Sequence, residues 1–241
     1  MNKEQLEILS ESLNVKPNVL DIWMPYFLKY LPREGINNPK RLLAFLAQIG
    51  QESGNFYYTE EIGNTNCVGY SGGCEYKGRG LIQLTHIGNY KKFRDKYGVD
   101  AVNNPSLIGG KYATTSSPEQ LKNSLLASTF YWNGMGDVPS LNELADKLDL
   151  SKSVYDEPNN QVFKCIGRKI NRGLYTDCTK PANDEATRLA NFEKLRLAYL
   201  KNKPKFASVN KNNKSLLGIS IITATLGLGL ISFWYIKYAK K

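Results

Sequence analysis

Hydrophobic positions dominate the segment from Arg41 to Gln51, which is apolar on nearly every face. Asn38 and Pro39 before it are a capping residue and a proline suited to the first helical position, and Gly54 after it is a stop signal. A helix that is apolar nearly all round lies inside a protein rather than on its surface. The pattern therefore predicts a buried helix over residues 41–51.

Helical periodicity and capping signals recur along most of the chain. The other predicted helices are Val19 to Tyr30, Asn89 to Tyr97, Ser117 to Trp132, Leu141 to Leu148, Gln161 to Ile170 and Asp184 to Leu200. Only Tyr76 to Thr85 invites a small β-hairpin, with Leu81, Gln83 and Thr85 on one side of an extended strand. The predicted fold class is mainly α, with a cleft between a larger helical lobe and a smaller one.

A second apolar segment, Ser215 to Ile236, has 22 residues without a charge. At about 1.5 Å per residue it is long enough to cross a hydrocarbon core of about 30 Å. Aromatic residues and lysines gather at its far end, as in an interfacial belt. We expect a catalytic domain over residues 1–200, a flexible polar linker over 201–214, a transmembrane helix over 215–236 and a basic tail over 237–241. A buried hairpin helix in a larger assembly is the alternative for the apolar segment.

The positive charge belongs mostly to the C-terminal part of the chain. Eight lysines and no acidic residue lie in residues 201–241, so the net charge of +10 leaves only +2 for residues 1–200. This excludes a strongly basic nucleic-acid surface on the domain and favours contact of the anchor with anionic lipid. Lysines flank both ends of the apolar segment, so its orientation is open. The polar start of the chain is unlike a signal peptide, which predicts a tail-anchored protein of a virion membrane or a host inner membrane.

Two separated glutamates supply candidate chemistry. Glu52 follows Gln48 by four residues, so both share a face of the buried helix, and burial and the helix dipole both disfavour a charged carboxylate at its C-terminal end. Glu52 is therefore the candidate general acid. Glu61 lies in a loop rich in glycine and asparagine, where a solvated carboxylate could act as a base, although spacing alone does not choose between it and Glu60. Gln83 and Thr85 could line the same cleft.

Four stretches resemble the glycoside hydrolase family 19 pattern, which chitinases and phage endolysins share. They are AFLAQIGQESG over residues 44–54, YKGRGLIQLT over 76–85 followed by Asn89 and Tyr90, LLASTFYW over 125–132 and KINRGL over 169–174. The likeness covers residues 1–200 and implies a lysozyme-like fold. The endolysin branch is the more similar one, because its second glutamate also follows the first by nine residues.

The resemblance implies a role for each matching residue. It implies that Glu52 is the general acid, Glu61 the general base and Thr85 the holder of the attacking water. The residues it implies as substrate contacts are Gln83, Asn89, Tyr90 and Asn171. Gln51 stands where the family usually has histidine, and an amide can donate a hydrogen bond but cannot titrate near pH 7.

The cysteines allow three pairings, of which Cys67 with Cys74 and Cys165 with Cys178 are the sequence-local choice. Disulfides would imply an oxidising destination such as the periplasm or the virion exterior, and free thiols are the alternative. His86 is the single histidine, and no cysteine pair has zinc-ligand spacing, so we expect no metal and no cofactor.

These observations predict a viral, membrane-anchored glycosidase that hydrolyses the muramyl linkage of bacterial peptidoglycan, for infection or for lysis. Chitin hydrolysis is the second possibility on the same scaffold. A lytic transglycosylase, which needs one acid/base carboxylate and no attacking water, is the third; Glu61 and Thr85 argue against it. A hypothesis of another class is a non-catalytic wall-binding or virion membrane protein with a sugar-binding cleft.

Overall fold

The computed structural model describes residues 1–63, 67 and 69–207, and the chain divides into two compact units, residues 1–201 and 202–241. The first unit is mainly helical, as predicted, and its α-helices are α1 (Lys3–Ser12), α2 (Pro17–Tyr30), α3 (Pro39–Glu52), α4 (Ile87–Tyr97), α5 (Pro118–Trp132), α6 (Asn142–Ala145), α7 (Asn159–Arg172) and α8 (Glu185–Lys201). Short 3₁₀ turns connect them at η1 (Gly73–Tyr76), η2 (Pro105–Ile108), η3 (Ala113–Thr115) and η4 (Gly134–Gly136). The two predicted lobes are thus parts of one compact unit.

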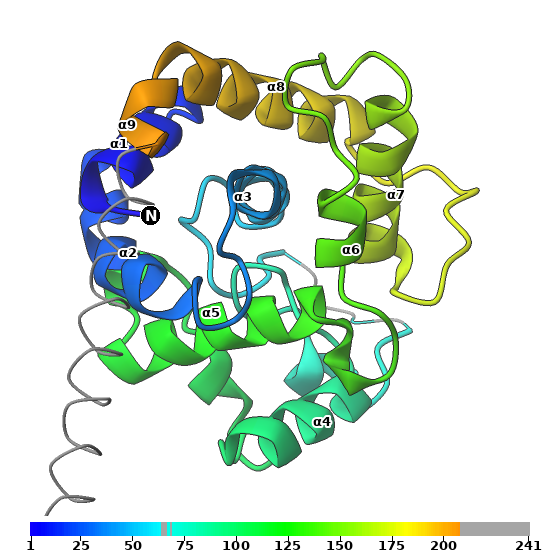
Figure 1. Cartoon of the computed structure of the whole chain (residues 1–241). Coiled ribbons are helices and arrows are strands. Elements are labelled where there is room, and N and C mark those ends of the chain that lie inside the picture. The colour runs from blue at the N-terminus through cyan, green and yellow to red at the C-terminus, as the bar shows by residue number, and fades with distance from the viewer. Residues whose placement is uncertain (64–66, 68, 208–241) are drawn as a thin grey trace, which may run out of the picture. The chain divides into compact units, whose positions relative to one another are not determined.

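Helix α3 lies at the centre of this unit. Figure 1 shows it end-on, with α1, α2, α5, α6, α7 and α8 around it. Its start follows the predicted signals, because the Asn38 side chain accepts a hydrogen bond from the Arg41 backbone N–H at 3.0 Å. Leu43, Phe45 and Ile49 are fully buried, and the helix packs mainly against α8. The buried helix predicted over residues 41–51 is confirmed.

The other predicted helices are present, with shifted ends. Ser117 caps α5 in a capping box with Gln120, which the sequence pattern at Pro118 indicated. Helix α6 is shorter than the predicted range of 141–148. Beyond it the chain makes tight turns, because the Lys147 N–H donates to the Leu144 carbonyl and the Leu148 N–H donates to the Ala145 carbonyl. Such bonds span three residues, so they do not continue an α-helix.

The predicted β-hairpin over Tyr76 to Thr85 is wrong, since the described residues contain only isolated β-bridges, among them Glu60 with Arg79 and Arg79 with Leu84. Gly80 and Gln83 have positive φ angles of 78° and 59°, which fold this stretch into a tight turn. A Cβ on Gly80 would lie 2.9 Å from the Ser124 carbonyl oxygen, so α5 leaves room there only for glycine. Leu81, Ile82 and Leu84 are all buried, and the expected alternation of sides is lost.

Helix α8 ends at Lys201, and the short helix α9 (Lys203–Ala207) lies at the start of the predicted linker. The flexible linker over residues 201–214 stays a prediction. Across residues 1–63, 67 and 69–207, no helix is both long and apolar enough to span a bilayer. The predicted transmembrane segment, Ser215 to Ile236, and the basic tail lie outside the described residues.

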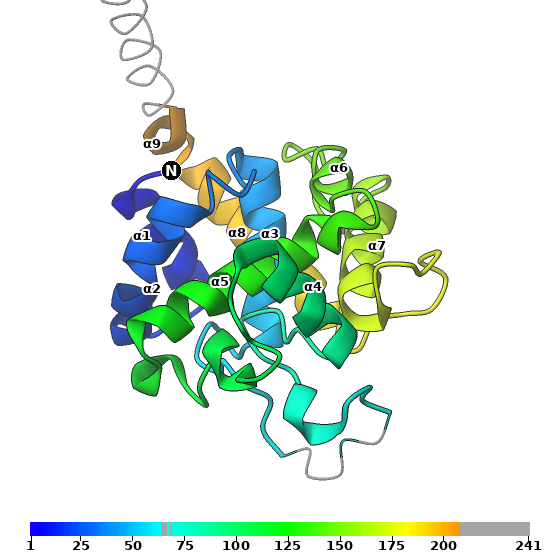
Figure 2. The same ribbon diagram turned by 90° about the horizontal axis from the view of Figure 1, so that it is seen from below.

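The segment between α3 and α4 has little regular structure. Figure 2 shows it, coloured cyan, on the side of the first unit away from α1. Backbone hydrogen bonds fix its course: the Glu61 N–H donates to the Gly78 carbonyl at 2.8 Å, and the Gly80 N–H donates to the Thr59 carbonyl at 3.0 Å. These contacts bring residues 58–62 beside residues 78–85, next to the end of α3.

Candidate active site

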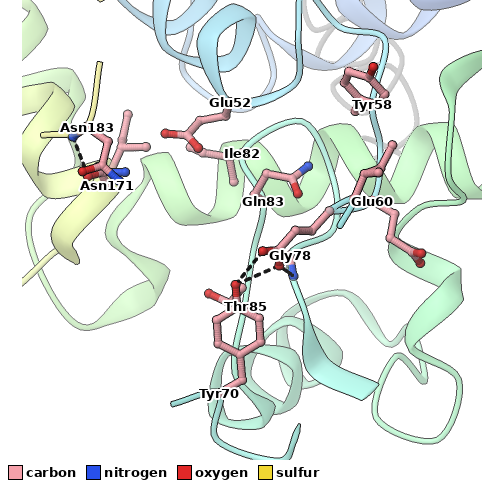
Figure 3. Close-up of a pocket in the computed structure, with 13 residues that line it drawn as sticks. Glu52, Tyr58, Glu60, Tyr70, Gly78, Ile82, Gln83, Thr85, Asn171 and Asn183 are labelled. Carbon is pink, nitrogen blue, oxygen red and sulfur yellow. Dashed lines mark hydrogen bonds between the residues drawn. The ribbon is translucent and has the colours of Figure 1, made fainter. Parts of the chain in front are cut away.

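An open pocket of about 640 Å³ lies where the end of α3, the loops of residues 58–85, and the end of α7 with the loop after it meet. It is lined by five of the predicted site residues, namely Glu52, Glu61, Gln83, Thr85 and Asn171. Figure 3 shows Glu52 between Asn171 on one side and Gln83 on the other. The tertiary structure therefore gathers residues that are far apart in the chain around one cavity.

Glu52 is the last residue of α3, and its carboxylate is held by α8. The Arg188 guanidinium donates to Oε1 of Glu52 at 2.5 Å and to Oε1 of Gln48 at 2.7 Å. Arg188 is only 3% exposed, so this ion pair is largely shielded from water. The positive charge opposes the effects of burial and of the helix dipole that the sequence suggested for Glu52. Oε2 has no hydrogen-bond partner within the described part of the chain, which leaves it available on the pocket side.

Tyr131 of α5 lies close enough to Glu52 to sense its charge. Its hydroxyl donates to the Lys169 carbonyl at 2.9 Å and approaches the Ile170 carbonyl at 3.3 Å. Burial raises the pKa of Tyr131, and the nearby charge of Glu52 raises it further. The tyrosine is therefore neutral at any physiological pH and joins α5 to the end of α7.

Glu61 is held by partners of a different kind. The Tyr70 hydroxyl lies 2.8 Å from both carboxylate oxygens, and the Gly78 N–H donates to Oε2 at 3.2 Å. A Cβ on Gly78 would lie 2.8 Å from Oε1 of Gln83, so a side chain at this position would collide with the pocket wall. These two neutral donors fix the orientation of the carboxylate.

Glu60, which the spacing could not distinguish from Glu61, has another environment. Its carboxylate forms ion pairs with Lys77 at 2.6 Å and with Arg79 at 3.0 Å. Figure 3 shows its side chain directed away from Glu52. Glu60 therefore serves as an anchor for the segment around Arg79, and the geometry favours Glu61 as a base.

Gln83 and Thr85 both line the pocket, although the strand that was expected to carry them is absent. The positive φ of Gln83 directs the chain through a turn, and its side-chain amide donates to the Gly80 carbonyl at 2.9 Å. Thr85 follows at the end of this turn and lines the pocket together with Tyr70. The turn thus provides polar groups on the Glu61 side of the pocket.

Asn89 and Tyr90, the other two predicted substrate contacts, do not line the pocket. The Asn89 amide donates to the Thr85 carbonyl at 2.8 Å, so it supports the turn before α4. Tyr90 is fully buried, where its hydroxyl donates to the Lys77 carbonyl at 2.7 Å and accepts from Arg79. Burial raises the pKa of Tyr90 to about 12. A direct sugar contact by Tyr90 is therefore corrected to a role inside the wall, because its ring fills the core behind Arg79.

Asn171 lines the other end of the pocket. Its side-chain oxygen accepts a hydrogen bond from the Asn183 N–H at 2.8 Å, and Asn183 lines the pocket as well. Gln51, at the position of the family's histidine, is directed toward Asp184, with 3.4 Å between its amide nitrogen and Oδ2. The loop after α7 is therefore tied to α3 close to Glu52.

Both disulfides of the sequence-local pairing are present. Cys67–Cys74 closes the loop that carries Tyr70, and Cys165–Cys178 joins α7 to the loop that follows it. The first loop reaches the pocket through Tyr70. In the part of the chain that the structure covers, no cluster of three His, Cys, Asp or Glu residues could hold a metal ion. The absence of a cofactor stays a prediction.

Sequence reasoning missed Arg188, Tyr70, Tyr58 and Asn183. Arg188 lies 136 residues from Glu52 in the chain, and its place on an otherwise ordinary helix carries no local signal. Tyr70 had one usable signal, since it lies between two cysteines that were expected to pair. Tyr58 is the last of three consecutive aromatic residues, 56–58, and nothing local marks it as a pocket residue.

Comparison with known proteins shows the fold. No protein-family model matches the chain. Chitinase C from Streptomyces griseus HUT6037 is similar in structure, with a TM-score of 0.50 and 22% sequence identity over 82% of this chain and 75% of that one. A bacterial family 19 chitinase has a TM-score of 0.47 and 22% identity over 82% of this chain and 93% of that one. At this identity the first likeness establishes a shared helical fold.

Proposed function

We propose that this chain is a glycoside hydrolase that cleaves the glycan strands of bacterial peptidoglycan by acid/base catalysis. One observation carries the proposal: Glu52 and Glu61 come from different elements, line the same open pocket and have contrasting partners. Glycosidases need two carboxyl groups in different environments, one to protonate the leaving oxygen and one to activate water.

Glu52 acts as the general acid in this mechanism. Arg188, which also donates to Oε1 of Gln48, donates to Oε1 of Glu52, so the proton is carried on Oε2 and passes to the oxygen of the scissile linkage. The Arg188 guanidinium then stabilises the carboxylate left behind by Coulomb attraction, which is strong because the guanidinium is buried. Arg188 is a positioning residue, since it acts through Glu52.

Glu61 acts as the general base. It takes a proton from a water molecule on the opposite face of the sugar, and the Thr85 hydroxyl holds that water. Tyr70 and Gly78 donate hydrogen bonds to Glu61, so its oxygens keep a fixed direction. Gln83 and Asn171 are polar groups on either side of Glu52 that suit the hydroxyl and amide groups of an amino sugar.

The choice of peptidoglycan is supported by two features of the sequence. Glu61 follows Glu52 by nine residues, as in the endolysin branch, and the apolar Ser215 to Ile236 segment suits an enzyme that a membrane holds near a bacterial wall. Delivery by a virus with a lipid membrane, or retention at a host inner membrane during lysis, both fit these features. Chitin is the second candidate substrate, because the similar solved structures are chitinases.

Mass spectrometry of soluble fragments tests the reaction. The full chain is incubated with purified peptidoglycan and, separately, with chitin. Reducing-end fragments from peptidoglycan are expected. Anhydro-ended fragments would replace hydrolysis with a lytic transglycosylase reaction, and release from chitin alone would move the substrate to chitin.

Variants test the roles. Removal of an acid or base group costs about 10²–10⁴-fold in rate, so E52Q and E61Q should each lose at least 100-fold while staying folded. E60Q should retain turnover within about tenfold of the wild type, because its carboxylate is an anchor rather than a reactant. E11Q, at an exposed position on α1, is the control. Loss of less than about tenfold in E52Q, with wall binding intact, would favour the non-catalytic wall-binding alternative.

A further inference from the structure

Three tyrosines form a continuous aromatic cluster at one end of the pocket. The ring centroids of Tyr57 and Tyr58 are 5.1 Å apart, those of Tyr57 and Tyr112 are 5.0 Å apart, and those of Tyr58 and Tyr112 are 5.8 Å apart. Tyr58 is 39% exposed and lines the pocket itself. In Figure 3 it lies at the end opposite Asn171, with Glu52 between them. A chain of sugars placed along the pocket would therefore reach this cluster, which we call the tyrosine platform.

The platform is built on backbone contacts that keep its rings together. The Ala113 N–H donates to the Tyr57 carbonyl at 2.8 Å, and the Thr59 N–H donates to the Lys111 carbonyl at 3.3 Å. An isolated β-bridge pairs Tyr58 with Tyr112. Two loops that are distant in the sequence thus present one surface, and ligand binding would not have to order it first.

Two lysines border the platform. The Lys16 ammonium lies 5.5 Å from the centroid of the Tyr57 ring, and the Lys111 ammonium lies 5.2 Å from that of Tyr112. Both side chains are exposed, and neither forms an ion pair with any residue that the structure describes. Lys77, by contrast, is paired with Glu60 close to the pocket. The attraction of a cation to the ring face keeps each ammonium at the platform while leaving its donors open.

We propose that the tyrosine platform, with Lys16 and Lys111, is a subsite for sugars that carry carboxylates. Ring faces of tyrosine stack against the C–H faces of a pyranose, and the two ammonium groups pair with negative charges on its substituents. This inference rests on the proposed function and adds that this part of the site recognises the negative charge of the substrate. A neutral amino-sugar polymer would contact the rings alone, so the lysines select an anionic glycan.

The carboxylates have two possible sources in peptidoglycan. One is the peptide that the lactyl group of the sugar bears, and the other is the lactyl carboxyl itself, which is charged only where no peptide is attached. An amidase removes the peptide and exposes the lactyl carboxylate, so amidase-treated strands separate the two sources. Chitin provides the same amino-sugar backbone without either charge.

Binding of the full chain to insoluble polymers tests the subsite. Co-sedimentation is measured in the E52Q background, so that cleavage does not remove the ligand, with intact peptidoglycan, amidase-treated strands and chitin. The double charge reversal K16E/K111E should raise the apparent Kd for intact peptidoglycan at least tenfold at low salt, because two attractions become repulsions. The effect should shrink as salt increases, and Kd for chitin should change less than twofold.

The matched control is K29E/K194E. Lys29 also lies over a tyrosine, 5.1 Å from the Tyr30 ring centroid, and Lys194 is exposed on α8, but Tyr30 is not one of the three tyrosines of the platform. This variant changes the net charge equally and keeps the lysine-rich C-terminus, so it reports non-specific attraction to the wall. Y58A tests the ring surface and should weaken binding to all three polymers, with its melting temperature measured to verify folding.

The outcomes are distinct. A tenfold loss on intact peptidoglycan assigns the lysines to the carboxylates of the peptide, because the lactyl carboxyl is held in an amide bond there. A tenfold loss on amidase-treated strands assigns them to the freed lactyl carboxylate, and a loss on both polymers shows that they pair with either charge. Equal behaviour of K16E/K111E and K29E/K194E, or no wall binding by the E52Q chain, overturns the subsite. The proposed function is judged separately by fragment release from the chain with Glu52 intact, so binding without cleavage would overturn the enzyme and leave the subsite standing.

Discussion

The Tyr70 hydroxyl lies 2.8 Å from each carboxylate oxygen of Glu61, and it has one proton to donate, so it supports either oxygen in turn. This residue reaches the pocket from a loop that the Cys67–Cys74 disulfide closes. It restricts the direction of the proposed base, because a positioned carboxylate loses less orientational freedom on reaching the transition state.

Y70F should lower kcat about tenfold with little change in KM, since a hydrogen bond to a charged group contributes about 1.5–3 kcal/mol. The melting temperature should stay within about 2 °C of the wild type, because Tyr70 is half-buried and its ring is retained. Y155F, at an exposed position away from the pocket, is the control. A wild-type kcat in Y70F would show that Gly78 and the remaining contacts hold Glu61 sufficiently.

Gly109 is a second residue on which the site depends, because the backbone next to it leaves no room for a side chain. A Cβ there would lie 2.3 Å from the Thr59 carbonyl oxygen, which accepts the Gly80 N–H. G109A should therefore push residues 58–61 outward, reduce unfolding free energy by about 1–3 kcal/mol and lower activity. G88A is the matched control, because nothing lies within 4 Å of a Cβ at Gly88. Thermal unfolding of G109A and G88A measures the loss of stability. Equal stability of the two variants would mean that residues 58–61 move aside freely.

At the scale of elements, Asp146 joins α6 to the start of α3. Its carboxylate accepts hydrogen bonds from the Arg41 guanidinium, from Nε at 2.8 Å and from Nη2 at 2.5 Å, and from the Asn38 amide at 3.1 Å. The hydrogen bond from Arg41 lowers the pKa of Asp146 below its usual 3.8, although burial acts in the opposite direction. The charged form of Asp146 is thus favoured in the folded state.

The lowered pKa of Asp146 sets the direction in which the stability of the protein changes with pH. The stabilisation by Asp146 is complete above about pH 4 and is lost as pH falls through the lower pKa of the folded state. D146N should therefore lower the melting temperature by about 1–4 °C at pH 6, because the carboxylate is 39% exposed and such pairs are screened by water.

The same variant should converge with the wild type below about pH 3. Melting curves between pH 2.5 and 7 measure the difference, and D21N at an exposed site is the control. A difference that is constant with pH would show that the contribution of Asp146 does not depend on its charge.

For the whole molecule, we propose that residues 215–236 place the enzyme at a membrane. The full chain should float with phospholipid vesicles, and a chain lacking residues 215–236 should stay in the soluble fraction at physiological salt. L226R/L228R keeps the segment length but places two charges in it, at about 2.5–3.5 kcal/mol each, and should also abolish flotation. L226A/L228A is the control. Flotation of the deleted chain would assign membrane contact to lysine charge alone.

The core helix and the two glutamates could be predicted because their signals are local. The Asn38-Pro39 start and the apolar run of α3 have a period and a cap that neighbouring residues complete. The hairpin over Tyr76 to Thr85 failed for the opposite reason. Its alternation was real in the sequence, but Gly80 packs against α5, so a distant carbonyl decides the turn.

Spacing along the chain does not separate Glu61 from Glu60, although the resemblance implies Glu61, and the fold gives the two residues different partners. Both residues are glutamates in one loop, and the approach of Lys77 and Arg79 to one and of Tyr70 to the other distinguishes them. Tyr90 shows the same limit of prediction from sequence. Its place in a motif indicated a ligand contact, whereas its burial behind Arg79 makes it part of the pocket wall.

The sequence by itself determined the helical class, the position of α3, the pairing options of the cysteines and the candidate carboxylates, because each depends on spacing along the chain. Only the tertiary structure decided that Arg188 pairs with Glu52 and that Tyr57, Tyr58 and Tyr112 share one surface with two lysines. The contacts of Arg188 with Glu52, of Tyr112 with Tyr57 and of Lys16 with Tyr57 join residues that are separated by tens of positions or more. Their energies arise from packing and charge in three dimensions, which no local pattern records.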